Sequence, residues 1–208
     1  MPKIYYSYYS PAGNSIPEVA FQEHMLGRKL LCKGLEHFYG LSFTLDALPS
    51  VLGIGENGKP FLKNFPQIHF NISHCNGLAA CAFHSQPIGI DAEQPGYFPR
   101  VLIEKALSFE EKSFLQTLSA SPALEQEWFY RFWTLKEAYV KRSGSGLDVV
   151  LTDFSFYFSD TTAKNGRFCV RCSDTGVSCY QKKLSHGQIL SLCCSGDMDE
   201  VCFCPHHA

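Results

Sequence analysis

The strongest helical pattern in the chain is centred on Phe132-Trp133-Thr134-Leu135-Lys136-Glu137-Ala138-Tyr139-Val140-Lys141. The pattern begins near Glu125 and ends at Ser143-Gly144, because glycine commonly terminates a helix. At about 100° per residue, one stripe of this helix is apolar and is expected to be buried: Trp128, Phe132, Leu135 and Tyr139. We expect the rest of the chain to pack around this helix.

Glu137 and Lys141 lie on the other side of the same helix. A glutamate four residues ahead of a lysine often forms a solvated pair that adds a few tenths of a kcal/mol. Trp133 and Val140 flank Glu137 on this side, however, and a carboxylate beside an aromatic ring needs a partner. The pattern alone leaves both interpretations open, an exposed ion pair and a functional carboxylate.

Length and composition indicate a globular protein. The 208 residues fit one large domain or two small ones, and 45% hydrophobic with 18% charged residues excludes an extensively disordered chain. A net charge of -2 gives no bulk attraction to nucleic acid. The chain has no apolar run of membrane-spanning length and no signal-peptide pattern. We expect a cytoplasmic protein that binds neither nucleic acid nor a membrane.

Ten cysteines raise the question of disulfides or zinc. They are scattered through expected strands and helices without a repeated spacing, which favours reduced and mostly buried thiols. A zinc site needs two well-spaced ligand pairs at one place. Cys202 and Cys204 in the C-terminal Cys/His tail share one face of an expected strand, and we do not expect a structural metal there.

The order of the expected elements is mixed. A tyrosine-rich strand from Lys3 to Tyr9 precedes a helix from Pro17 to Tyr39 and a Gly/Pro-punctuated loop from Val51 to Pro66. Basic residues occur on the helix, at Arg28, Lys29 and Lys33, and on the loop, at Lys59. A solvated helix face explains the first group and a ligand contact is the alternative. The same two interpretations apply to Lys59, although a lysine on a stiff turn is well placed to meet a ligand.

Three strands are predicted between residues 68 and 93. The dipeptide Asn76-Gly77 is a strong hairpin signal, and Ser85-Gln86-Pro87 reverses the chain again. The first and third strands therefore run in the same direction. We expect Ser73-His74, which ends the first, and Asp91-Ala92-Glu93, which ends the third, at the same edge of one sheet.

Asp91 and Glu93 leave the same face of the third strand because side chains alternate along a strand. Two carboxylates this close repel unless a cation or a proton lies between them. Oxygen ligands favour Mg²⁺ or Mn²⁺ over zinc, and Mg²⁺ typically combines one or two carboxylates with water and substrate phosphate. The alternative is a solvated strand end. Ser73 and His74 have three interpretations: a nucleophile and its base, a satisfied turn histidine, or donors to a phosphate oxygen.

Several of these segments, taken together and in this order, resemble the surfactin-type 4'-phosphopantetheinyl transferases. The segments are Gly58-Lys59-Pro60, His69-Phe70-Asn71-Ile72-Ser73-His74, the run at 87–93, Ser108-Phe109-Glu110-Glu111, the helix at 132–141 and Gly144-Ser145-Gly146-Leu147. The resemblance is close from Gly58 to Leu147 and weaker around Gly27-Arg28-Lys29.

The resemblance implies transfer of the phosphopantetheine arm of coenzyme A to a serine of an apo acyl or peptidyl carrier protein, with release of adenosine 3',5'-bisphosphate. The implied fold is α+β, with two similar α/β halves related by a pseudo-twofold, residues 1–86 and 87–208. Coenzyme A would lie in the cleft between the halves of a monomer.

The resemblance also implies the following roles. Metal positions fall on Asp91, Glu93 and Glu137; the lysine that meets the pyrophosphate falls on Lys141; coenzyme A contacts fall on Lys59, Ser73 and His74; and a further acidic position near the carrier serine falls on Glu111. Glu137 would also accept the serine proton, directly or through water. Larger members hold the 3'-phosphate with basic residues of a longer N-terminal region, a role that Arg28 and Lys29 would partly take here.

Two other classes of function stay open. A metal-dependent enzyme that cleaves a different pyrophosphate would keep Asp91, Glu93 and Glu137 but need no carrier protein. A non-catalytic binder of coenzyme A or of carrier proteins is the other class. The three carboxylates argue against a non-catalytic binder, because a module that only binds an anionic ligand gains nothing from negative side chains around it.

Overall fold

The computed structural model describes residues 1–12, 15–159, 167–198 and 200–206. The first part of the chain forms β1 (Lys3–Tyr8), α1 (Ile16–Tyr39), α2 (Leu48–Val51), β2 (Leu52–Ile54), β3 (Pro60–Leu62), β4 (His69–Cys75) and β5 (Leu78–His84). The second part forms β6 (Ile88–Glu93), α3 (Val101–Ala106), α4 (Phe109–Thr117), α5 (Pro122–Ser143), β7 (Phe156–Phe158), β8 (Arg167–Phe168), β9 (Val170–Cys172), β10 (Val177–Lys183), β11 (Ile189–Ser195) and β12 (Cys202–Pro205). Helices and strands are thus mixed, and the expected α+β class is confirmed.

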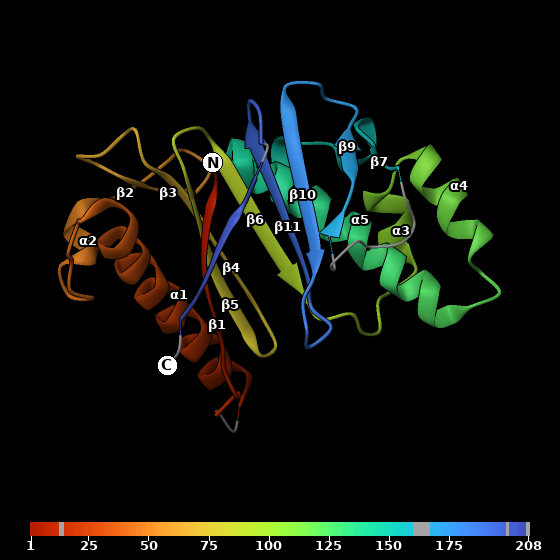
Figure 1. Cartoon of the computed structure of the whole chain (residues 1–208). Helices are drawn as coiled ribbons and strands as arrows, with labels where there is room; N and C mark the ends of the chain where they lie inside the picture. Colours follow the sequence, from red (N-terminus) through yellow and green to blue (C-terminus); the bar gives the residue numbers. More distant parts are fainter. Residues whose placement is uncertain (13–14, 160–166, 199, 207–208) are drawn as a thin grey trace.

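Two four-stranded sheets form the centre of the described structure (Figure 1). The first has the strand order β12-β1-β5-β4 and the second β6-β11-β10-β8. The division expected after residue 86 falls between β5 and β6, which belong to different sheets. The chain departs from a purely sequential division at its end, because β12 pairs in parallel with β1 in the first sheet.

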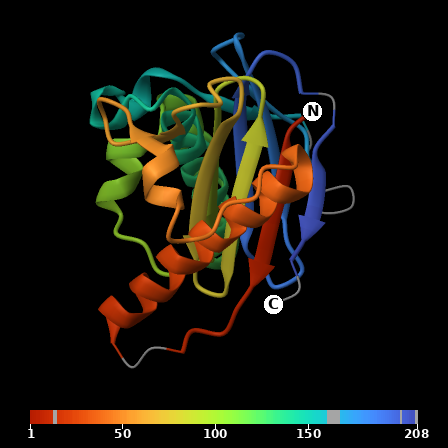
Figure 2. The same cartoon turned by 90° about the vertical axis from the view of Figure 1, so that its left-hand side faces the viewer.

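Each sheet buries one face against a helix and the other against the opposite sheet. Helix α1 lies across the first sheet (Figure 2), and their contact buries Leu30, Leu35, Phe70 and Phe83. A shared cluster that includes Ile4, Ile88, Ile90 and Leu192 joins the two sheets. Burying an aliphatic or aromatic side chain of this size stabilises a fold by about 1.5–3 kcal/mol.

Helix α5 covers the second sheet, as the sequence pattern indicated. It runs from Pro122 to Ser143 and ends at Gly144 in the left-handed region, with φ 69°. Three members of the predicted stripe, Trp128, Phe132 and Leu135, are buried in a cluster that α5 forms with α4, β7 and β9 as well as with the second sheet, and Tyr139 is half-buried. The local signals for this helix therefore agree with its tertiary packing.

Two expectations about the segments between residues 51 and 93 need correction. The segment expected as a loop at 51–66 contains a short antiparallel hairpin, β2 and β3. The first and third predicted strands, β4 and β6, were expected in one sheet, but β6 belongs to the second sheet, where it pairs with β11. The hairpin signal at Asn76-Gly77 is correct, since β4 and β5 pair antiparallel around it. Strand pairing across a distant part of the chain leaves no local signal, which explains the difference for β6.

Side chains join β4 to β6 where a backbone ladder would otherwise be expected. Asn71 Oδ1 accepts a hydrogen bond of 2.9 Å from the Ile90 amide, and Ser73 Oγ accepts one of 3.2 Å from the Ala92 amide. These bonds satisfy amides of β6 that face the first sheet, and they place the ends of β4 and β6 together.

In the described part of the chain, no helix is long and apolar enough to cross a membrane.

Candidate active site

The three carboxylates that were expected to act together lie where β6 meets α5. Asp91 and Glu93 leave the face of β6 that also carries Gly89, and α5 packs on that face. A Cβ on Gly89 would lie only 2.0 Å from the Ala138 carbonyl oxygen, so only glycine permits this approach. The close contact brings Glu137, the residue before Ala138, toward the two strand carboxylates.

Burial and mutual repulsion shift the titration of these groups. Burial, with Asp91 and Glu137 nearby, raises the pKa of Glu93 from 4.5 to about 7, against the opposing effects of Lys141 and a hydrogen bond from Trp133. Burial and the Asp91 charge raise the pKa of Glu137. Burial also raises the pKa of Asp91, although Lys141 and Ser73 act against it. The carboxylates therefore interact electrostatically in a partly desolvated site.

Asp91 has one satisfied and one unsatisfied oxygen. Lys141 Nζ lies 2.5 Å from Oδ1, and Ser73 Oγ donates to the same oxygen at 3.1 Å. Oδ2 is buried and has no hydrogen-bond partner among the described residues. A buried anionic oxygen without a donor is costly, and a bound cation would satisfy it.

A metal ion at this site would have to rely partly on ligands from outside the protein. Among the residues that the structure describes, no three Asp, Glu, His or Cys side chains are arranged as a ready-made metal centre. Mg²⁺ fits such a site because it commonly takes one or two carboxylates together with waters and substrate phosphate oxygens. The hard carboxylate oxygens and the unpaired Oδ2 of Asp91 thus fit Mg²⁺ or Mn²⁺.

Lys59 links the two halves beside a large cavity. Its Nζ donates to the carbonyl oxygens of Ile88, at 2.9 Å, and Arg142, at 2.8 Å. Burial, together with the nearby Arg142 charge, lowers the pKa of Lys59 from 10.5 to about 8. The cavity has a volume of about 530 Å³ and is lined by Lys59, His69, Arg142 and Ser145, among others. It opens at the ends of β4 and β6 opposite to the carboxylates.

The remaining residues expected to bind coenzyme A fall into two groups. Ser73 is buried against Asp91, and His74 follows it on β4 with its side chain 40% exposed. The Nδ1 atom of His74 lies 3.1 Å from Glu23 Oε2. Arg28 and Lys29 lie on α1, and their side chains make no hydrogen bond or ion pair with the described residues. The structure therefore brings Ser73 to the carboxylates but records no such contact for the two basic residues.

Glu111, which was expected near the carrier serine, is held by contacts inside the second half. It is buried, and Oε2 accepts from the Ser108 amide at 2.9 Å in a capping box that begins α4. The Phe156 amide donates to Oε1 at 2.8 Å, and Lys136 Nζ lies 2.9 Å from Oε2. Both carboxylate oxygens are thus used inside the second half. In this arrangement Glu111 supports the fold next to α5 and does not join the three carboxylates.

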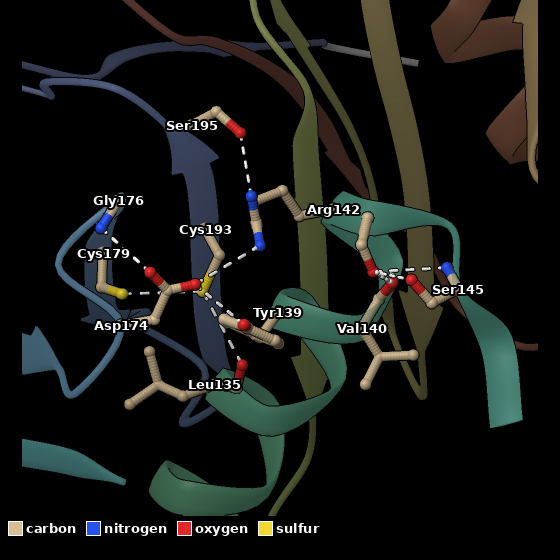
Figure 3. A network of polar contacts seen from close by, with 11 residues as sticks. Leu135, Tyr139, Val140, Arg142, Ser145, Asp174, Gly176, Cys179, Cys193 and Ser195 are labelled. Atoms are coloured by element: carbon tan, nitrogen blue, oxygen red, sulfur yellow. Dashed lines mark hydrogen bonds and ion pairs between the residues drawn. The ribbon is translucent and has the colours of Figure 1, made fainter. Parts of the chain in front are cut away.

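The C-terminal end of α5 is anchored by residues that the sequence did not single out. Figure 3 shows Arg142 donating to Ser195 Oγ at 2.9 Å and approaching Asp174 at 3.9 Å. Tyr139 donates to the same aspartate at 2.9 Å. These contacts hold the turn of the helix that carries Lys141. The sequence indicated only that Arg142 lies near the end of a helix. Its partners Asp174 and Ser195 are distant in sequence, so no local pattern could predict these contacts.

The cysteines form no disulfide in this structure. All ten are free, and the sulfur atoms lie 3.7 Å apart in two pairs, Cys179 with Cys193 and Cys202 with Cys204. Cys202 and Cys204 share one side of β12, and no metal centre is formed by the described residues of the tail.

Comparison with known proteins identifies a family and several relatives that this chain matches. Residues 87–194 match the family model of the 4'-phosphopantetheinyl transferase superfamily. The chain is 34% identical over 154 residues to 4'-phosphopantetheinyl transferase Sfp of Bacillus subtilis, covering 73% of this chain and 66% of that protein. It is 33% identical over 123 residues to 4'-phosphopantetheinyl transferase AcpT of Escherichia coli K12, covering 57% of this chain and 62% of that protein.

Among solved structures, Thermotoga maritima holo-[acyl-carrier-protein] synthase matches 54% of this chain and 64% of its own, with a TM-score of 0.39 and 22% identity. The matches to the two curated relatives span no more than about two thirds of their length.

Proposed function

Because this chain belongs to the 4'-phosphopantetheinyl transferase superfamily, we propose that it transfers the phosphopantetheine arm of coenzyme A to a serine of an apo carrier protein. The carrier would be an acyl or peptidyl carrier protein, and the second product adenosine 3',5'-bisphosphate. One observation carries the proposal: Asp91 and Glu93 of β6 meet Glu137 and Lys141 of α5 in one partly buried site.

Lys141 supplies the positive charge of this site. Its Nζ is held by Asp91, yet the side chain is 32% exposed, so a pyrophosphate can reach it. Cleavage at the β-phosphate of coenzyme A leaves negative charge on the departing pyrophosphate oxygen. A preorganised lysine in a desolvated site stabilises that charge more strongly than water does.

Asp91, Glu93 and Glu137 would hold a divalent cation, Mg²⁺ or Mn²⁺. The unpaired Oδ2 of Asp91 and the raised pKa values of the other two support this assignment, since both indicate negative charge without enough compensation. When bound, such an ion neutralises charge on the pyrophosphate. The protein's part is to hold the three carboxylates in place on β6 and α5.

Glu137 is the group best placed to accept a proton from the incoming serine. It is half-buried on α5, and its raised pKa makes it a stronger base than an exposed glutamate. The nucleophile belongs to the carrier protein, so no serine of this chain has to be activated. Ser73 is accordingly used as a hydrogen-bond donor to Asp91.

Coenzyme A would extend from the carboxylates along the junction of the two halves. The cavity beside Lys59 is large enough for part of a nucleotide, and Lys59 and Arg142 give its wall positive charge. His74, Arg28 and Lys29 would meet phosphate oxygens at the other side of the first half. Since all these residues come from one chain, a monomer would suffice. Ten free thiols are in keeping with the reducing cytoplasm.

The test is to incubate the protein with coenzyme A, Mg²⁺ and a panel of apo carrier proteins and to measure intact masses. We expect a carrier to gain the mass of the arm, with no gain in excess chelator or with a carrier whose serine is replaced by alanine. Cleavage of coenzyme A without any carrier would favour a pyrophosphate-cleaving enzyme. Binding of coenzyme A without either reaction would favour a binding module, and both results would overturn the proposal.

A further inference from the structure

His74 belongs to a small network that connects the residue after β1, Tyr9, with α1 and β4. Its Nδ1 lies 3.1 Å from Glu23 Oε2 on α1. The hydroxyl of Tyr9 donates to the other oxygen of the same carboxylate, Oε1, and also contacts the Cys75 carbonyl oxygen at 3.2 Å. Each oxygen of Glu23 therefore has its own donor, and the carboxylate cannot turn without losing one of them.

The packing of α1 on the first sheet places Glu23 over His74. One helical turn after Glu23, Gly27 lies against Ile72 so closely that a Cβ would be 2.8 Å from the Ile72 side chain. Side chains at positions four residues apart share one face of a helix, so Glu23 faces β4 two residues further along that strand. The pair is thus fixed by the helix-to-strand contact and not by flexible side chains alone.

This pair differs from an ordinary surface ion pair on the same helix. Lys33 and Glu36 lie 3.3 Å apart with side chains 55% and 51% exposed, and such pairs contribute about 0–1 kcal/mol. The Glu23 side chain is only 14% exposed, while that of its partner His74 is 40% exposed. A mostly buried carboxylate that holds a more exposed imidazole is the arrangement by which proteins orient a functional histidine.

We propose that Glu23 is a positioning residue for His74, which it holds so that Nε2 can meet a phosphate oxygen of coenzyme A. An imidazole bound through Nδ1 to a carboxylate can carry its second proton on Nε2, and in that form it donates to a phosphate. Among the described residues Nε2 makes no hydrogen bond. The inference rests on the proposed function and adds to it Glu23, with Tyr9 as its support.

The first test compares Glu23→Gln with wild type in coenzyme A binding by calorimetry and in steady-state modification of a carrier. We expect the dissociation constant and the KM for coenzyme A to rise about tenfold, with kcat changed less than about threefold. Glu36→Gln, on the same helix, is the matched control and is expected to change neither constant. An unchanged KM in Glu23→Gln would overturn the inference.

A double-mutant cycle separates positioning from a merely structural role. In a His74→Ala background, Glu23→Gln should have little further effect on coenzyme A affinity, because the residue that it positions is gone. A further tenfold loss in that background would overturn the inference. Nitrogen chemical shifts of His74 should also change with Glu23→Gln in the folded protein and remain as in wild type with Glu36→Gln.

These measurements stay informative if the proposed function fails. Binding of coenzyme A by the wild-type protein without carrier modification would refute the transferase but leave the binding comparison valid. Carrier modification by a Glu23→Gln variant with wild-type KM would refute the role of Glu23 and leave the transferase in place.

Discussion

At the scale of single residues, Glu137 is the test of the proposed chemistry. Replacing it by glutamine keeps the side-chain length but removes a base and a charged ligand. We expect the rate of carrier modification to fall about a hundredfold or more in Glu137→Gln. The fold should persist, because burial and the Asp91 charge disfavour the ionised Glu137 carboxylate in the folded protein, as its raised pKa shows. A neutral glutamine does not carry this cost.

Carrier modification and thermal unfolding of Glu137→Gln, measured beside wild type, check this expectation. An exposed Glu137–Lys141 pair would instead cost less than about 0.5 kcal/mol and leave the rate unchanged. Such an outcome would remove the proposed base and the main support for a transferase.

The titration of Glu93 predicts how stability depends on pH. Its pKa is about 7 in the folded protein against 4.5 ordinarily, so between these values the folded state binds more protons than the unfolded state. The stability from this group is complete below pH 4.5 and is lost as the pH rises through about 7. In chelator, the unfolding temperature of wild type should therefore fall over this range relative to that of Glu93→Gln. Parallel curves for the two proteins would contradict the assignment.

At the scale of elements, the contact of α5 with β6 depends on Gly89. Alanine there would put a Cβ 2.0 Å from the Ala138 carbonyl oxygen and 2.3 Å from the Arg142 amide nitrogen, both backbone atoms of α5. The helix would have to move, and overpacking of this kind costs about 1–3 kcal/mol or more. We expect Gly89→Ala to lower the free energy of unfolding by at least that amount and to reduce carrier modification by displacing Glu137.

Gly96→Ala is the control for this prediction, because the nearest atom to its added Cβ would be 3.8 Å away. Denaturant unfolding of both variants should show a loss for Gly89→Ala and a change within about 0.5 kcal/mol for Gly96→Ala. Equal stabilities would show that the helix does not depend on this close approach.

At the scale of the whole molecule, β12 connects the end of the chain to both halves. Phe203 on this strand packs 6.1 Å from the ring of Tyr6 in the first sheet and 5.7 Å from that of Tyr180 in the second. We expect Phe203→Ala to destabilise the fold by about 2 kcal/mol, less than a fully buried phenylalanine would, because Phe203 is only half-buried. The KM for coenzyme A should not change, since β12 carries no residue of the proposed site.

Phe109→Ala provides the comparison, because that ring is 78% exposed and its loss should leave stability nearly unchanged. Chemical unfolding of the two variants measures the difference. Equal stability of Phe203→Ala and wild type would show that β12 contributes little to joining the halves.

Features that depend on neighbouring residues could be predicted from the amino-acid sequence alone. The period of α5 and its stop at Gly144, and the hairpin at Asn76-Gly77, all follow from local geometry. The common face of Asp91 and Glu93 follows from the alternation of a strand. The motifs also sufficed to identify the family, and they singled out the residues that the fold brings together around Asp91.

Strand pairing and the burial of polar groups became visible only in the folded molecule. The placement of β6 in a second sheet and the return of β12 to β1 join parts of the chain that are distant in sequence. The same holds for Glu111, whose carboxylate is used by Lys136 and the Phe156 amide, and for Glu23 of α1, which meets His74 of β4. Burial and long-range pairing depend on the whole packed molecule, and no local pattern of residues encodes them.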